Sequence, residues 1–206
     1  MALQAAEYLK AQGFLDGRPL VLFGHSTGGW AARLLAHHPL VGPSIRCIVT
    51  LGTPHRGAEM VDLALRSGPW EERAARLVRY DLARRRSIFG ELATPNLGEL
   101  NRKYPDLPQV PVYSLAGALA FEELSWVQQI SAQRAGLRNT LSDGFFSLEN
   151  QKWGQFVDHF GLEHTEEVGF SIRANPFARK RFRSEFQRLL ESLEVLFRTQ
   201  GEISPR

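Results

Sequence analysis

Residues 20–36 read LVLFGHSTGGWAARLLA, in which a short apolar run is followed by a glycine-flanked serine and then by helix-forming residues. The continuous apolar character of residues 20–23 is typical of a strand buried inside a parallel sheet. Residues 28–38 indicate a helix, which Pro39 ends. We therefore predict that Ser26 lies on a sharp turn between a strand and a helix.

The pattern G-x-S-x-G, which runs from Gly24 to Gly28, is specific when it stands between a strand and a helix. A serine on such a turn adopts strained backbone angles, and the flanking glycines relieve crowding where the helix crosses the strand. The helix N-terminus supplies backbone N–H groups for a developing oxyanion, and the Thr27 N–H is the expected donor. We interpret Ser26 as a catalytic nucleophile; the alternative is a glycine-rich turn with an incidental serine.

A serine hydroxyl is a poor nucleophile at neutral pH and needs a base, usually a histidine that a carboxylate orients. Where the serine lies on a strand-to-helix turn, the chain order is serine, acid, histidine. His159 and His164 both come late enough in the sequence to be the base. Asp143, within a Ser-Asp-Gly sequence, is the candidate acid, although an Asp-Gly pair is equally typical of a simple turn. Chain order alone leaves these alternatives open.

Helices and strands alternate along the rest of the chain. The patterns predict a helix at residues 2–11, strands at 46–51 and 110–116, and an amphipathic helix at 182–197 that packs on the sheet. A polar, arginine-rich and helical stretch at 58–107 separates the second and third strands. This alternation predicts a single α/β domain over residues 1–206, with a mostly parallel sheet, helices on both faces and a lid-like insert at 58–107.

The composition is ordinary for a globular enzyme, with 43% apolar residues, 23% charged residues and a net charge of +3. Arginines gather between Arg73 and Arg86; we interpret them as a solvated helix face, with attraction to anionic lipid surfaces as the alternative. No basic–aromatic module predicts binding of nucleic acid. The single cysteine, Cys47, lies in a buried-strand pattern and is interpreted as an inert core thiol. Residues 1–7 lack a signal-peptide pattern, and neither the compartment nor the oligomeric state follows from the sequence.

Several motifs follow one another along the chain. They are GHSTGG at 24–29, TLGTPHRG at 50–57, LNRKYPDLP at 100–108, YSLAG at 113–117, SDG at 142–144, KWG at 152–154 and HTEEVG at 164–169. In this order they resemble bacterial triacylglycerol lipases and esterases of the α/β-hydrolase superfamily, in particular the calcium-associated lipases of pseudomonads. The resemblance covers roughly residues 20–170 and implies the α/β-hydrolase fold.

The resemblance also implies a function, namely hydrolysis of carboxylic esters through an acyl-enzyme. It makes Ser26 the nucleophile, Asp143 the acid and His164 the base, and it requires no cofactor. In the family the base precedes an acidic pair and an apolar residue, as His164 does and His159 does not. The expected partners are a small ester or a lipid substrate and a lipid surface. An acyltransferase on the same fold and a non-catalytic remnant of it are the rival interpretations.

Other residues are assigned to the walls of the site rather than to its chemistry. We expect the insert at 58–107 and a segment at 118–138 to act as lids over an acyl pocket. The expected wall residues of this pocket are Phe121, Leu124 and Trp126. His55, Trp30 and Trp153 are interpreted as structural residues or pocket walls.

The chain departs from the family at two points. Family members have earlier strands and a His-Gly loop that supplies a second oxyanion N–H. We therefore expect an N-terminally shortened domain that lacks the first strands, with an exposed apolar edge at residues 20–23. In the family, a carboxylate two residues after the catalytic histidine and an amide four residues further on help to hold Ca²⁺. Glu166 matches the first position and Phe170 replaces the second, so no metal ion is expected.

Overall fold

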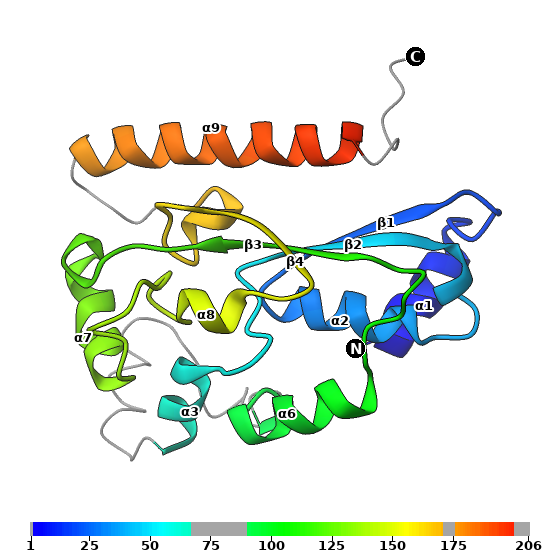
Figure 1. Ribbon diagram of the computed structural model, residues 1–206, viewed down its shortest axis with the longest axis horizontal. Coiled ribbons are helices and arrows are strands. Elements are labelled where there is room, and N and C mark those ends of the chain that lie inside the picture. Colours follow the sequence, from blue (N-terminus) through cyan, green and yellow to red (C-terminus); the bar gives the residue numbers. More distant parts are fainter. Residues whose placement is uncertain (1, 67–89, 171–175, 200–206) are drawn as a thin grey trace.

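The computed structural model of the protein describes residues 2–66, 90–170 and 176–199 (Figure 1). Within these ranges four strands form one parallel sheet in the order β1-β2-β3-β4. The strands are β1 at Leu20–His25, β2 at Ile45–Leu51, β3 at Val112–Gly117 and β4 at Gln155–Phe160. The first three lie where the apolar runs of the sequence predicted strands.

Helices connect these strands. The longer ones are α1 at Ala2–Ala11, α2 at Thr27–Ala36, α3 at Glu59–Arg66, α6 at Thr94–Lys103, α7 at Trp126–Arg134 and α9 at Pro176–Thr199. The short ones are α8 at Leu148–Gln151 and the 3₁₀ turns η1 at Gly42–Ser44, η2 at Phe121–Glu123 and η3 at Glu166–Val168. In the described parts of the chain, none of these helices combines the length and the apolar character that a membrane crossing needs.

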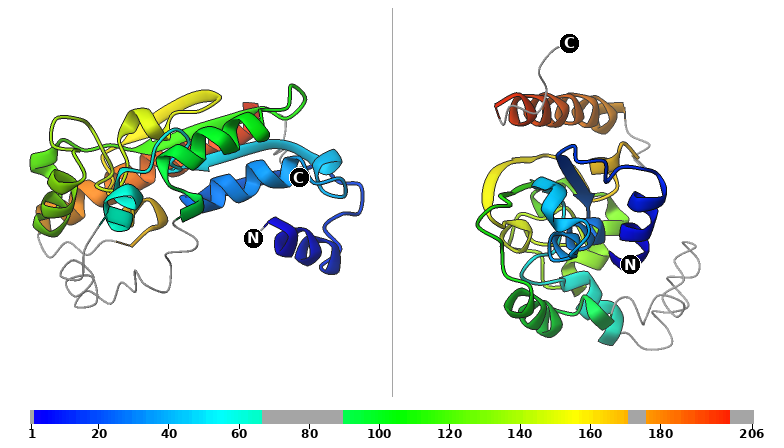
Figure 2. Two further views of the ribbon diagram at one scale, coloured as in Figure 1. Left: turned by 90° about the horizontal axis from the view of Figure 1, so that it is seen from below. Right: turned by 90° about the vertical axis from the view of Figure 1, so that its right-hand side faces the viewer.

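Two helical layers enclose the sheet. Figures 1 and 2 show α1 and α2 against one face and the long helix α9 against the other. Along β2 the side chains alternate between the faces, so that Ile48 packs with Leu35 of α2 while Val49 packs with Leu189 of α9. Phe160, at the end of β4, is fully buried on the α9 side. The fold is therefore a sheet with helices on both faces, as the sequence predicted.

The parallel sheet brings the ends of distant strands together. Because all four strands run in the same direction, their carboxyl ends lie at one edge. Ser26 directly follows β1, and His164 follows β4 after a short turn. Asp143 reaches the same edge because its neighbour Ser142 forms an antiparallel bridge with Leu119, just beyond β3. The three residues of the predicted site thus meet at this edge.

The insert between β2 and β3 is represented by α3 and α6. Thr94 links the two helices, because its backbone N–H donates to Asp62 Oδ1 at 3.0 Å and its hydroxyl donates to Asp62 Oδ2 at 2.6 Å. The arginine block between Arg73 and Arg86 lies outside the described residues. Whether the insert acts as a lid stays a prediction.

Candidate active site

Ser26 lies at the turn from β1 into α2 with backbone angles of φ 55° and ψ −127°. A positive φ is strained for a residue with a side chain and is found where a fold over-determines the conformation. Two glycines make the turn possible. A Cβ atom on Gly24 would lie 2.5 Å from backbone atoms of Gly28, and one on Gly29 would lie 2.2 Å from the hydroxyl oxygen of Thr53.

Hydrogen bonds to the end of β2 hold the strained serine in place. The Ser26 N–H donates to Leu51 O at 3.0 Å, and the Thr53 hydroxyl donates to Ser26 O at 2.9 Å. Thr27 begins α2, so its N–H has no acceptor within the helix and is free to bind an oxygen outside it. The turn therefore presents a half-buried hydroxyl beside a backbone donor.

A chain of hydrogen bonds connects Ser26 to two buried residues. His164 Nε2 lies 3.0 Å from Ser26 Oγ, and His164 Nδ1 lies 2.7 Å from Asp143 Oδ2. His164 is 8% exposed and Asp143 is fully buried. With its proton on Nδ1, the neutral imidazole donates to the carboxylate and accepts from the serine hydroxyl. The structure thus brings together the three residues that the sequence predicted.

Asp143 is fixed by its own loop. Its Oδ1 accepts hydrogen bonds from the N–H groups of Phe145 and Phe146, both at 2.7 Å, which leaves Oδ2 facing His164. The backbone N–H of His164 also donates to the backbone carbonyl of Asp143 at 2.9 Å. The ring of Phe145 stacks on the imidazole with centroids 5.0 Å apart, and the ring of Phe146 meets it edge-on at 5.1 Å. These contacts hold the imidazole in one orientation.

A second histidine and a second carboxylate lie next to this chain of hydrogen bonds, and neither was predicted from the sequence to belong to the site. His25 Nε2 lies 2.8 Å from Glu167 Oε2 and 3.1 Å from the carbonyl oxygen of His164. Glu167 Oε2 is also 3.6 Å from His164 Nδ1. The available signals were the histidine inside the G-x-S-x-G pattern and the acidic pair that follows His164.

Burial controls the charge of this second pair. Burial raises the pKa of the Glu167 carboxyl well above its usual range, and the nearby charge of Asp143 raises it further. Burial also lowers the pKa of the His25 imidazole. Both shifts favour the neutral forms of Glu167 and His25, and of the two carboxyl groups Asp143 lies closer to His164 Nδ1, at 2.7 Å against 3.6 Å.

A buried arginine connects α2 to α6 beneath the site. The guanidinium of Arg33 lies between two indole rings, 4.4 Å from the centroid of Trp30 and 4.2 Å from that of Trp153. Its Nη1 donates to Asn101 Oδ1 at 2.9 Å, and Nη2 lies 3.4 Å from Asp106 Oδ1. Burial lowers the pKa of Arg33 to about 10, which leaves the group charged at neutral pH.

The remaining histidine candidates lie away from Ser26. His55 is fully buried, where it contacts the Thr50 hydroxyl at 3.1 Å and stacks on Trp153 at 5.5 Å. His159 lies on β4 with its half-exposed side chain beside Asp158, and His159 Nδ1 is 3.9 Å from Asp158 Oδ1. The structure therefore places His164, and not His159, at the serine.

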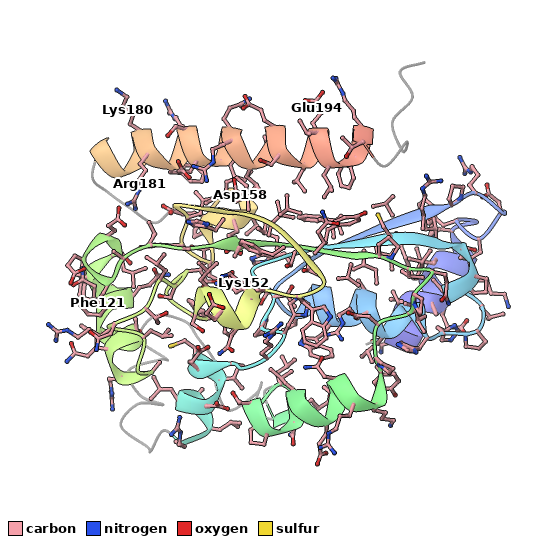
Figure 3. The ribbon with its side chains drawn as sticks, viewed as in Figure 1. Phe121, Lys152, Asp158, Lys180, Arg181 and Glu194 are labelled. Carbon is pink, nitrogen blue, oxygen red and sulfur yellow. The ribbon has the colours of Figure 1, made fainter. Side chains whose placement is uncertain are left out.

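The residues expected to form an acyl pocket do not gather at the site. Leu124 is buried in a small cluster with Leu119 and Leu137, against which Phe121 packs, and Trp126 is 74% exposed. Figure 3 shows Phe121 at the α7 end of the molecule.

The described residues do not fit the calcium site that the family resemblance suggested. Glu166 Oε2 accepts the N–H of Glu163 at 3.0 Å, and the side chain of Phe170 is exposed and has no ligating atom. Within the described residues, the potential metal ligands that lie close together are His25, His164 and Glu167, which are already hydrogen-bonded. A set with two imidazoles does not suit a hard cation that prefers oxygen ligands.

Comparison with known proteins adds a family likeness at the N-terminal part of the chain. The family model of the PGAP1-like alpha/beta domain matches residues 8–66, which include β1, the turn at Ser26 and α2. No curated protein matches the sequence.

Several solved structures share the fold. The mature form of the lipase BlEst2 from Bacillus licheniformis has a TM-score of 0.60 and 20% identity over 79% of this chain and 65% of that lipase. The Staphylococcus hyicus lipase has a TM-score of 0.60 and 14% identity over 91% of this chain and 72% of the lipase. A metagenomic carboxyl esterase has a TM-score of 0.62 and 16% identity over 85% of this chain and 55% of the esterase.

The fold is therefore that of the α/β-hydrolases, and its structural relatives include bacterial lipases and esterases. The expected fold class is confirmed, and the resemblance to these lipases and esterases holds at the level of the fold. The chain spans 65% of the Bacillus lipase and 55% of the esterase, so the likeness extends to part of each of those proteins.

Proposed function

We propose that this protein hydrolyses carboxylic esters and that Ser26 is its nucleophile. The observation that carries the proposal is the unbroken hydrogen-bonded chain from Ser26 Oγ through His164 to Asp143, with heavy-atom distances of 3.0 Å and 2.7 Å. Such a chain raises the nucleophilicity of an otherwise weak hydroxyl. The strained turn and the free N–H of Thr27 add the geometry that acyl transfer needs.

In the first half-reaction, Ser26 Oγ attacks the ester carbonyl carbon while its proton moves to His164 Nε2. The carbonyl oxygen becomes an oxyanion, and the Thr27 N–H donates a hydrogen bond to it. When the tetrahedral intermediate collapses, the bond to the alcohol oxygen breaks and His164 returns the proton to that oxygen. The alcohol leaves, and the acyl group remains on Ser26.

In the second half-reaction, water attacks the acyl-enzyme. His164 takes a proton from the water, and a second tetrahedral intermediate forms at the same carbon. Its collapse breaks the bond to Ser26 Oγ, which recovers the proton, and a carboxylic acid is released. Asp143 stays ionised throughout, where it holds the proton on Nδ1 and stabilises the imidazolium. The two N–H bonds to its other oxygen keep it in position.

The nucleophile assignment can be tested with a fluorophosphonate probe, which labels activated serines. The probe should label the native protein at Ser26, and Ser26→Ala should abolish the label. Ser184→Ala is the matched control, because that serine is exposed on α9 and should leave labelling unchanged. Persistent labelling of Ser26→Ala would contradict the assignment, and no labelling of the native protein would favour a non-catalytic remnant.

The base is tested by paired histidine substitutions. Hydrolysis of p-nitrophenyl acetate should fall by about three orders of magnitude or more in His164→Ala, because the three residues act as a unit. His159→Ala removes a half-exposed imidazole that does not contact Ser26, and should change turnover little. The reverse ranking would contradict the proposed mechanism.

A further inference from the structure

A cavity opens between α2 and α6 next to the candidate nucleophile. Its volume is about 330 Å³, which lies in the range of roughly 300–1,000 Å³ that small-molecule pockets occupy. One end is formed by Thr27, the residue that follows Ser26. From there the groove, as we call this cavity, follows the α2 surface through Trp30, Ala31 and Leu34. These positions recur at helical spacing and so form a single face of α2.

The floor of the groove is apolar and firmly held. Trp30 and Leu92 are buried, and Ala31, Leu34 and Leu100 are partly buried. The Trp30 indole cannot turn freely, because its N–H donates to Pro54 O at 2.9 Å and the Arg33 guanidinium packs on its ring. The floor thus offers apolar contact area that is already in place before a ligand binds.

Polar side chains are confined to the rim. The α6 side carries the exposed residues Asn96, Glu99 and Lys103, and Glu91 lies just before that helix. The mouth carries two carboxylates, Glu91 and Glu99, and one ammonium group, Lys103, so it does not attract an anionic ligand. An apolar floor below a polar rim suits an unbranched hydrocarbon chain, which gains free energy from burial along its whole length.

The chemistry of the proposed reaction decides which part of an ester lies in the groove. The alcohol oxygen must receive its proton from His164 Nε2, so the alcohol portion leaves on the histidine side of Ser26. The groove begins at Thr27, whose N–H is the proposed oxyanion donor, and the described residues that line it do not include His164 or its neighbours in the turn after β4. Resting on the proposed function, we propose that the groove between α2 and α6 binds the acyl chain of the ester and selects a medium-length, unbranched one.

Distances along α2 indicate how long an acyl chain the groove can hold. At 1.5 Å per residue, Ala31 lies about 6 Å and Leu34 about 10 Å from Thr27 along the α2 axis. A large side chain at position 31 therefore blocks the groove near the nucleophile, and one at position 34 blocks it further away. Removing the Leu34 side chain lengthens the space that is open to the acyl chain.

The test is the dependence of kcat/KM on acyl length for p-nitrophenyl acetate, butyrate, octanoate and palmitate. Ala31→Phe should lower the octanoate-to-acetate ratio by 10- to 100-fold, on the order of what one misfitted apolar group costs in a pocket. Leu34→Trp should shift the preferred length from octanoate to butyrate, and Leu34→Ala should shift it toward palmitate. Leu40→Trp, at an exposed leucine beyond the end of α2, is the matched control and should leave the length profile unchanged.

A second series varies the alcohol, with acetate esters of butanol, octanol and hexadecanol. If the α2 variants change the dependence on alcohol length and leave the dependence on acyl length unaltered, the groove holds the alcohol and the inference is overturned. The inference is also overturned if neither dependence changes.

A binding measurement separates this inference from the proposed function. Calorimetric titration of Ser26→Ala with sodium octanoate needs no turnover, and the double variant Ser26→Ala/Ala31→Phe should bind octanoate at least tenfold more weakly. Fluorophosphonate labelling of the native protein with no octanoate binding to Ser26→Ala would leave the nucleophile assignment standing and overturn the acyl groove. The absence of labelling would contradict the proposed function itself.

Discussion

The strained conformation of Ser26 depends on Gly24 and Gly29, at which a side chain would collide with neighbouring atoms. Gly24 lies where the start of α2 crosses β1, and a Cβ atom there would meet backbone atoms, which cannot move aside as a flexible side chain would. Gly24→Ala should therefore displace the start of α2 and lower the free energy of unfolding by about 1–3 kcal/mol, the usual cost of overpacking. The measurement is urea denaturation followed by circular dichroism.

Gly28→Ala is the control in the same motif. No atom lies within 4 Å of a Cβ at position 28, and its backbone angles are helical rather than left-handed. Alanine is favoured over glycine in a helix by up to about 1 kcal/mol, so this variant should be as stable as the native protein or more stable. Equal destabilisation by both substitutions would show that crowding at Gly24 is not the cause.

Glu167 should make stability depend on pH. Burial, followed by the charge of Asp143, raises its folded-state pKa well above the usual value near 4.5, so the folded protein binds this proton more tightly than the unfolded chain does. The resulting stabilisation is complete below the usual pKa and is lost as the pH rises through the raised pKa. Glu167→Gln cannot ionise and should lack this loss.

The difference between native protein and Glu167→Gln is the quantity to measure, by urea denaturation from acid to alkaline pH. The native protein should lose free energy of unfolding relative to Glu167→Gln as the pH rises. Glu149→Gln, at an exposed carboxylate, should show no such trend. A trend of opposite sign would mean that Glu167 is ionised in the folded protein.

The predictability of the site follows from the range of the interactions that define it. Ser26 was predictable because strand, turn and helix are contiguous in sequence, and His164 because of the residues that follow it. The pairing of His25 with Glu167 was not predictable. It joins positions 142 residues apart, and its distance of 2.8 Å follows from how β1 and the turn after β4 pack.

At the scale of elements, the strands with continuous apolar runs were predictable and β4 was not. Gln155, Asp158 and His159 interrupt the apolar residues of β4, and most of its side chains are exposed or partly buried. An edge strand needs to bury one face only, so its sequence carries a weaker signal. Hydrogen bonding to β3 decides that the segment is a strand.

The contact between α2 and α6 through Arg33 could not be predicted from the sequence, for a different reason. Arg33 has the sequence character of a surface residue, yet it is 3% exposed between two indole rings and bonded to Asn101 of α6. A planar guanidinium can stack on both rings and still donate hydrogen bonds in its plane, which no apolar side chain achieves. Charge patterns along one helix do not reveal such a partner, because Trp153 lies far away in the sequence.

At the scale of the whole molecule, α9 completes the core from the far side of the sheet. It lies along that face (Figure 1) and packs through Leu189, Leu196 and neighbouring aromatic rings. Arg181 at its start also pairs with Glu123 Oε1 of η2 at 2.8 Å. β2 contributes side chains to the apolar clusters on both faces of the sheet, so the layer of α9 and the layer of α2 pack against the same strand.

Two adjacent leucines of α9 test whether the layers unfold as one unit. Leu189 is 1% exposed and Leu190 is 47% exposed, although both are leucines in the same helical turn. Leu189→Ala should lower the free energy of unfolding by about 2–5 kcal/mol because it leaves a cavity against the sheet. Leu190→Ala should change it by less than about 0.5 kcal/mol. Urea denaturation should be followed by circular dichroism and by tryptophan emission in a background in which Trp70, Trp126 and Trp153 are replaced by phenylalanine, so that the emission reports buried Trp30, which packs in a cluster separate from that of α9. Because the sheet couples the two faces, both signals should shift to the same lower urea midpoint in Leu189→Ala. A midpoint for Trp30 that stays at the native value would show instead that α9 unfolds independently of the layer that carries the candidate nucleophile.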